Sequence, residues 1–342
     1  MSFTPFQAPL NAGYLGDAET AELFSVRAEL EVMLSFEAAL AEVQGDLGII
    51  PVETATAIVD GLGSFRPDMT VLASGSARDG MVVPALVTEL RTVLGEHVHH
   101  GSTSQDVIDT SAMMRLRDCV ALHAERLEGI IGTVEALSER FGERETMSRT
   151  RMQQALPIRW CDRFGNWLGL LASVHDAVPQ RFPVQVGGPD GTCHLFPDRA
   201  LEVRLGVAER LGLTCPAHHW QVDRTPIAEI ANWLALCAGA LGKIGADVAL
   251  LAQNEVAEVR LTGGGSSSAM AHKNNPVQAE ALTALARFCA VQAGGVGQAM
   301  VHENERSGAA WSLEWMLVPA LAVANGAATR TAAEMLNGLT VR

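Results

Sequence analysis

The sequence predicts an all-α protein in which long helices form a bundle that is completed by oligomerisation. Apolar residues recur at helical spacing along most of the 342 residues, and few segments alternate as half-buried strands do. Hydrophobic residues make up 48% of the chain, with one tyrosine and much alanine and glycine, as in closely packed helices. A heptad stripe near residue 240 is the clearest single pattern.

Capping residues and helix-stopping residues place the first elements. Asp17 is a suitable N-cap for a helix that runs to about Gly48, where this glycine and Pro51 end it. A second helix is predicted over residues 52–62. Residues 75–101 show little strong periodicity, so we expect a loop there.

Longer helices are predicted in the rest of the chain. One covers residues 107–140, with Asp106 near its start. Two more cover residues 276–300 and roughly 309–337. Helices of this length need neighbours to bury their apolar faces, which favours a bundle.

The heptad stripe belongs to a further long helix. Its apolar residues alternate spacings of four and three over three repeats: Ile230, Leu234, Cys237, Leu241, Ile244, Val248 and Leu251. Alanine and glycine occupy the other faces, so close neighbours are expected on several sides. We interpret the helix as the centre of an oligomeric bundle. Burial within a monomer is the alternative, because a heptad does not name its partner.

Charge and cysteine usage exclude several classes of protein. The formal net charge of −14 argues against nucleic-acid binding. The longest uncharged run in the Ile230 region ends at Lys243, short of the ~20 residues that a membrane span needs. Six well-separated cysteines, no CxxC pair and no signal peptide indicate a cytoplasmic protein with free, mostly buried thiols.

The histidines do not form a recognisable metal site. His97, His99 and His100 cluster, and His218 lies beside His219. No second histidine or carboxylate stands at i+4 on a clear helix to complete a ligand set. We therefore expect no bound metal.

Residues 263–276, with the sequence GGGSSSAMAHKNNP, carry the strongest indication of chemistry. Hydroxyl groups on a glycine-rich loop precede the cation of Lys273, and Pro276 can open the next helix. Such a loop suits proton transfer beside a carboxylate. A flexible linker is the alternative, because most glycine and serine runs are linkers.

The loop resembles the signature of the fumarase/aspartase superfamily, G-S-S-x-M-P-x-K-x-N-P. Ser266 replaces its glycine and Ala271 replaces its proline, while the remaining positions agree. Residues 98–110 resemble the first family region, a histidine followed by T-S-x-D-x-x-D-T, and residues 148–157 resemble the second, R-T-x-x-Q-x-A-x-P. The three motifs stand in the family's order and cover nearly the whole chain.

Within the superfamily, the chain is most similar to the 3-carboxy-cis,cis-muconate cycloisomerases, the lactonizing enzymes. Relatives that release fumarate usually carry a catalytic histidine directly after the Arg-Thr pair of the second region. Here that position is Arg151, and a guanidinium cannot act as a general acid near neutral pH because it does not release its proton there. The resemblance thus favours cycloisomerisation of a tricarboxylate without metal or cofactor. A fumarate-releasing lyase and a non-catalytic helical assembly remain the alternatives.

The resemblance also implies a role for each matching residue. Ser267 matches the catalytic acid/base, and Lys273 and Asn275 would stabilise an intermediate with extra negative charge on a carboxylate. Substrate carboxylates would be held by the residues that match the family's binding set: His99, Thr103, Ser104, Arg151, Gln154 and Arg306.

Several of these residues have a simpler structural interpretation. Thr103 and Ser104 can cap the helix that starts near Asp106. His99 can be a hydrogen-bonded structural histidine. Trp311 and Trp315 lie where nucleotide-processing relatives tend to have polar groups, but they are as easily core residues.

The resemblance finally implies a homotetramer whose active sites are shared between subunits. We expect an N-terminal helical domain over residues 1–105 and a bundle domain over residues 106–342 that carries the catalytic loop 262–276. Longer relatives have a further small helical domain, which this sequence is expected to lack.

Overall fold

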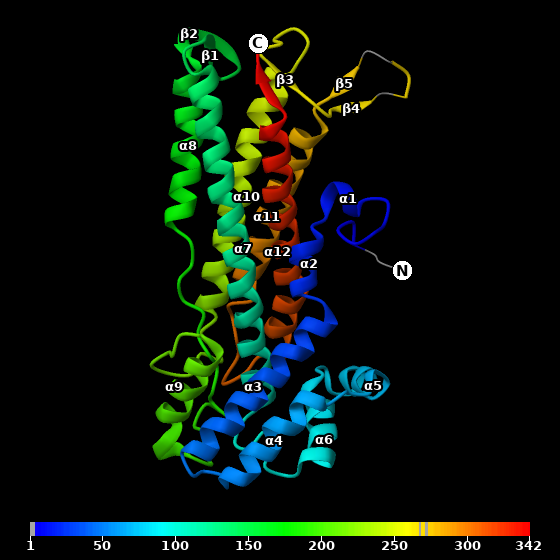
Figure 1. Ribbon diagram of the computed structural model, residues 1–342, viewed down its shortest axis with the longest axis vertical. Helices are drawn as coiled ribbons and strands as arrows, with labels where there is room; N and C mark the ends of the chain where they lie inside the picture. The colour runs from blue at the N-terminus through cyan, green and yellow to red at the C-terminus, as the bar shows by residue number, and fades with distance from the viewer. Residues whose placement is uncertain (1–3, 267, 271–272) are drawn as a thin grey trace.

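The computed structural model describes residues 4–266, 268–270 and 273–342. Figure 1 shows an elongated molecule in which long helices run side by side along the length, with shorter helices gathered at one end. The long helices are α7 (Ser104–Phe141), α8 (Trp160–Asp176), α10 (Thr225–Leu251), α11 (Val277–Gln298) and α12 (Gly308–Asn337). The all-α prediction is confirmed.

The predicted helix from Asp17 to Gly48 is two helices in the structure. A short helix α1 (Ala12–Leu15) precedes α2 (Ala18–Leu23), and α3 spans Val26–Asp46. The break falls at Ser25, whose hydroxyl accepts a hydrogen bond from the backbone N of Ala28 at 3.1 Å and so starts a new helix. Asp17 caps α2 as expected.

The expected loop over residues 75–101 is wrong. After α4 (Val52–Ser64), the chain forms α5 (Met69–Asp79) and α6 (Val83–Leu94). Asp68 caps α5 through its carboxylate, and Gly80 ends it in the left-handed conformation. The two helices have only 11 and 12 residues, and each ends at a glycine with positive φ, Gly80 or Gly95, a residue that also suits a loop.

The predicted long helices are confirmed with small shifts at their ends. All seven heptad residues of α10 are buried, against α11 and α12 of the same chain. A Cβ atom added at Gly242 would lie 2.3 Å from the Cβ of Ala286, and one at Gly245 would lie 2.8 Å from the Cβ of Leu282. The small residues therefore permit close contact between α10 and α11. The heptad stripe is satisfied within one chain and gives no evidence of an oligomer.

Helix α10 is also long and apolar enough, by length and composition, to cross a membrane. More than half of its most apolar window, 56%, is buried inside the structure. Core helices pass the same test, so α10 is weak evidence for a membrane span.

Short strands close the end of the bundle opposite the short helices (Figure 1). β1 (Glu145–Thr150) and β2 (Gln153–Arg159) form an antiparallel hairpin directly after α7. β3 (Val259–Leu261) pairs with β6 (Leu339–Val341). β4 (Gly265–Ser266) pairs with β5 (Asn274–Asn275) and forms the stem of the glycine-rich loop.

The buried apolar residues form two clusters. One lies among the long helices, and the other joins α3, α4 and α6 to the first turns of α7 and to α9 (Ala200–Leu211), which follows a 3-10 turn (Pro197–Arg199). All six cysteines are free, and four of them are buried: Cys119, Cys193, Cys237 and Cys289. The expected free, mostly buried thiols are confirmed.

Candidate active site

The described residues of the predicted site lie on elements at two opposite ends of the molecule (Figure 1). His99, Thr103 and Ser104 lead into the N-terminus of α7, and Arg306 contacts the same point. The hairpin β1–β2 and the stem β4–β5 lie at the other end. Helix α7 has 38 residues and is therefore about 57 Å long. One chain alone does not bring the two groups together.

At the α7 end, the structure joins Thr103 to Arg306. The guanidinium of Arg306 donates from Nη2 to Thr103 Oγ1 at 3.1 Å and from Nε to Gln105 Oε1 at 3.0 Å. Thr103 is also the N-cap of α7, and its backbone N donates to Asp106 Oδ2 at 3.0 Å. Thr103 therefore both caps α7 and contacts Arg306. A helix N-terminus beside a guanidinium is a favourable place for a carboxylate.

His99 is held by a residue that the sequence did not point to. Its Nδ1 lies 2.7 Å from Oε1 of Glu37 on α3. Burial by itself lowers the pKa of His99, but the Glu37 carboxylate outweighs it and the pKa is raised. The backbone of His99 has a φ of 62°, an uncommon conformation for a residue with a side chain. Tertiary contacts therefore fix this histidine in place.

Asp106 fastens the start of α7 to the loop that precedes α9. Its carboxylate accepts from the backbone N atoms of Gly187 and Gly188, both at 2.9 Å. Burial raises the pKa of Asp106 to about 7, against the opposing effect of these hydrogen bonds. Because the backbone N of Thr103 also donates to Asp106, this carboxylate links Thr103 to Gly187 and Gly188 and so fixes its position.

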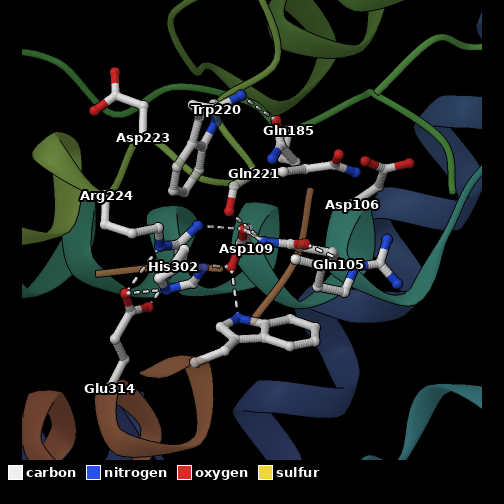
Figure 2. Close-up of polar contacts among 12 residues, drawn as sticks. Gln105, Asp106, Asp109, Gln185, Trp220, Gln221, Asp223, Arg224, His302 and Glu314 are labelled. Atoms are coloured by element: carbon white, nitrogen blue, oxygen red, sulfur yellow. Dashed lines mark hydrogen bonds and ion pairs between the residues drawn. The ribbon is translucent and has the colours of Figure 1, made fainter. Parts of the chain in front are cut away.

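Gln105 connects Arg306 to a buried ionic cluster, which is shown in Figure 2. Arg224 donates to both oxygens of Asp109, at 2.7 and 3.0 Å, and to both oxygens of Glu314, at 2.8 and 2.6 Å. Trp311 Nε1 donates to Asp109 at 3.0 Å, so this tryptophan is a core residue with a polar contact. Asp109, Arg224 and Glu314 also line a cavity of about 380 Å³ between the N-terminal helices and the bundle.

At the opposite end, the second motif forms the hairpin β1–β2. Arg151 and Met152 make its turn, with φ values of 49° and 68°, and Arg151 and Gln154 are exposed. Arg149 binds Glu258 at 2.6 Å, and this ion pair fastens the hairpin to the segment before β3. The exposed side chains at the tip can therefore meet another molecule without disturbing the hairpin.

The signature loop leaves and returns through β4 and β5. Asn275 is half-buried in β5, and Lys273 is exposed just before it. The carboxamide of Asn274 fills the space beside Gly264, where an added Cβ would lie 1.9 Å from Asn274 Oδ1. Ser267, the predicted acid/base, lies outside the described residues. Among the residues that are described, no group of three or more His, Cys, Asp or Glu side chains could hold a metal ion.

The long-helix bundle, with signature segments at both of its ends, defines an enzyme fold of the lyase class. The family model described as lyase (Lyase_1) matches residues 18–290. The chain therefore belongs to this lyase family, and the resemblance to the fumarase/aspartase superfamily is confirmed.

Curated relatives cover almost the whole chain. A 3-carboxy-cis,cis-muconate cycloisomerase of Pseudomonas aeruginosa is 33% identical, over 100% of this chain and 77% of the relative. A nitrosuccinate lyase of Streptomyces davaonensis is 35% identical, over 98% of this chain and 74% of the relative.

Solved structures agree with these relatives. The 3-carboxy-cis,cis-muconate lactonizing enzyme of Pseudomonas putida superposes with a TM-score of 0.92 and 32% identity, over 98% of this chain and 78% of that one. A fumarate lyase of Mesorhizobium sp. BNC1 gives 0.89 and 30%, over 96% of this chain and 76% of that one.

Proposed function

We propose that the protein is a 3-carboxy-cis,cis-muconate cycloisomerase that closes its tricarboxylate substrate to carboxymuconolactone in the breakdown of aromatic acids. The observation that carries this proposal is the likeness, over nearly the whole chain, to lactonizing enzymes in both sequence and structure. Arg151 at the position of the second-motif histidine supports the same choice, because an arginine cannot serve as a general acid. The free, mostly buried thiols suit a cytoplasmic enzyme.

In the proposed reaction, one substrate carboxylate adds through its oxygen to a carbon of a conjugated double bond. The displaced electron pair moves towards the carbon α to another carboxylate, which takes on extra negative charge. Lys273 and Asn275 stabilise that charge, and Ser267 delivers a proton to the α carbon. Formation of one C–O bond and one C–H bond completes the lactone.

The remaining site residues bind the substrate carboxylates. Arg306 presents a guanidinium beside Thr103 and the first turn of α7, where Ser104 is the first residue. His99 lies at the same end of the molecule as Arg306. Arg151 and Gln154 lie at the opposite end, so in the proposed site they come from another subunit. The positive charges of Arg306 and Arg151 next to the substrate would offset the repulsion from the negative charge of the protein as a whole.

The active site is therefore proposed to form only in an oligomer, a homotetramer with sites shared between subunits. The separation of the two groups by the length of α7 is its main support. Large apolar side chains are also exposed along the bundle helices: Leu236 and Leu250 on α10, Val291 on α11 and Met316 on α12. Exposed apolar side chains on neighbouring helices are typical of a face that meets another subunit.

A direct assay tests the reaction. With purified protein, 3-carboxy-cis,cis-muconate is expected to lose its conjugated-diene absorbance rapidly, whereas the Ser267→Ala variant is expected to be slower by about 10²–10⁴-fold, the usual contribution of a general acid. Adenylosuccinate, argininosuccinate and nitrosuccinate are tested separately as alternative substrates. A stable diene together with fumarate from one of these substrates would assign the protein to the fumarate-releasing lyases instead.

That second function is favoured by the 35% identity to the nitrosuccinate lyase and by the structural likeness to a fumarate lyase. It requires another residue to replace the histidine that fumarate-releasing relatives carry at position 151. A non-catalytic assembly would give no turnover with any of these substrates.

Arg151 is proposed to bind the third carboxylate. Its replacement by alanine is expected to raise KM by about tenfold or more, the effect of losing a charged hydrogen bond, with a smaller change in kcat. Steady-state kinetics on the diene substrate measure both constants. An unchanged KM would remove Arg151 from the binding set.

A further inference from the structure

The side chain of His302 is buried, and its two ring nitrogens have no hydrogen-bond partner among the residues that the structure describes. It lies in the loop between α11 and α12, four residues before Arg306, and its side chain is 0% exposed. Buried polar groups in folded proteins are nearly always paired, so an unpaired ring calls for an explanation. His302 is not among the residues of the proposed active site.

The ring faces the buried ionic cluster (Figure 2). Its Nε2 lies 3.7 Å from Oε1 of Glu314 on α12, a distance too long for a hydrogen bond. The other charged groups around it are Arg224 before α10, Asp109 on α7 and Glu303 in its own loop. One small movement of the ring would let a neutral imidazole donate its N–H to Glu314.

The cluster has an uncompensated charge. Arg224 contributes one positive charge, whereas ionised Asp109 and Glu314 contribute two negative charges, and the three side chains are 1%, 2% and 5% exposed. A net negative charge in such a place is unfavourable, so a nearby proton is favoured. His302, whose Nε2 lies 3.7 Å from Glu314, could take such a proton as the pH falls.

The ring is neutral at neutral pH. Burial lowers the pKa of His302, and the Arg224 guanidinium lowers it further, whereas burial raises the pKa of Glu314. Because the pKa of His302 lies below its usual value of about 6.5, the proton is gained only at acidic pH. The protonated ring would then compete with Arg224 for Glu314.

A chain of hydrogen bonds leads from this cluster to Arg306. Gln105 donates from Nε2 to Asp109 Oδ2 at 3.1 Å and to the backbone O of Gln221 at 2.8 Å. Its Oε1 therefore faces Arg306, from whose Nε it accepts at 3.0 Å. A change in how Arg224 holds Asp109 would shift Gln105 and, through it, Arg306.

We propose that His302 is a positioning residue: after a small movement from the 3.7 Å separation seen here, the neutral ring donates to Glu314 and supports the cluster, and its protonation moves Arg306 and weakens the binding of a carboxylate there. The proposal rests on the proposed function only in taking Arg306 as a carboxylate-binding group. His302 itself is not expected to touch the substrate.

Two variants separate the parts of the proposal. His302→Gln keeps a donor for Glu314 but cannot titrate, so its KM at pH 7.5 is expected to match the natural protein. His302→Leu has no donor, so its KM is expected to rise at every pH, with little change in kcat. Thermal unfolding identifies any variant that fails to fold, and His218→Gln, at an exposed histidine, is the matched control.

Binding of fumarate, a dicarboxylate that stays ionised over this range, gives a readout without turnover. Its Kd, measured by calorimetry from pH 7.5 to 5, is expected to rise in the natural protein and in His218→Gln. If one proton controls binding, the Kd of fumarate can rise by at most about tenfold for each pH unit below the pKa of His302. The rise in Kd for His302→Gln is expected to be smaller over the same range, because His302 no longer contributes and groups such as Asp106, whose pKa is raised to about 7, remain to titrate.

The results distinguish this inference from the proposed function. The same rise of Kd in His302→Gln, or no binding of fumarate at any pH, would overturn the role of His302. If the diene substrate is not converted but the fumarate profile depends on His302, the cycloisomerase assignment alone fails.

Discussion

Two inactive variants are expected to restore activity when their subunits are mixed. Lys273→Ala and Arg306→Ala should each reduce turnover by about 10²–10³-fold, because each removes a charged group from the site. Subunits of the two variants that are unfolded together and refolded should recover activity. If Lys273 and Arg306 of one site come from different subunits, random mixing leaves about a quarter of the sites with both natural residues.

The reason is the separation of the two residues along α7. Arg306 contacts Thr103 at the N-terminus of that helix, while Lys273 directly precedes β5, which lies at the end of the bundle where α7 finishes (Figure 1). A helix of 38 residues keeps them apart by roughly 50 Å or more. No movement of a short loop closes such a distance within one chain.

A matched pair of variants serves as the control. Lys273 and Asn275 lie on the same stem, so Lys273→Ala mixed with Asn275→Ala should recover nothing, since every stem lacks one of the two residues. Activity of the mixtures is compared with that of each variant alone. Recovery in the control, or none in the first mixture, would contradict a site shared between subunits.

Removal of Arg224 is expected to cause the largest loss of stability. Arg224→Met leaves the carboxylates of Asp109 and Glu314 buried without their counter-charge, which costs about 3–5 kcal/mol. Urea unfolding at one protein concentration measures the change. The concentration is held constant because association of subunits in the proposed oligomer would contribute to apparent stability.

An exposed ion pair is the control for this variant. Arg181 and Glu229 form a salt bridge whose side chains are 70% and 47% exposed, so Arg181→Met should change stability by no more than ~1 kcal/mol. Adding Asp109→Asn and Glu314→Gln to Arg224→Met should recover part of the loss, because no buried charge is then unpaired. Equal effects of Arg224→Met and Arg181→Met would show that burial of the cluster does not matter.

The helices that the sequence predicted best are those with long, regular apolar patterns. The heptad of α10 and the segments of α7, α11 and α12 needed only local spacing to be recognised. Helices α5 and α6 were missed because they have only 11 and 12 residues and each ends at a glycine, a residue that also suits a loop. The break at Ser25 was missed because a serine that caps a new helix looks like any polar residue within a longer one.

The partners of the site residues could not be predicted from the sequence. Glu37 lies 62 positions from His99, and Arg224 lies 115 positions from Asp109 and 90 from Glu314. No periodicity links residues so far apart. Gln105 was within the first motif, but only its contacts with Asp109 and Arg306 give it a role.

The sequence by itself determined the all-α class, the long helices and the three motifs that place the chain in its lyase family. These depend on residue spacing and on the identity of neighbouring side chains, which are local properties. The tertiary structure decided that the heptad of α10 is buried within one chain and that the motifs lie at opposite ends of the bundle. It also decided that Arg224 joins three elements in a buried cluster. These features depend on how distant segments pack, because burial and charge pairing are set by neighbours in space and not by neighbours in the chain.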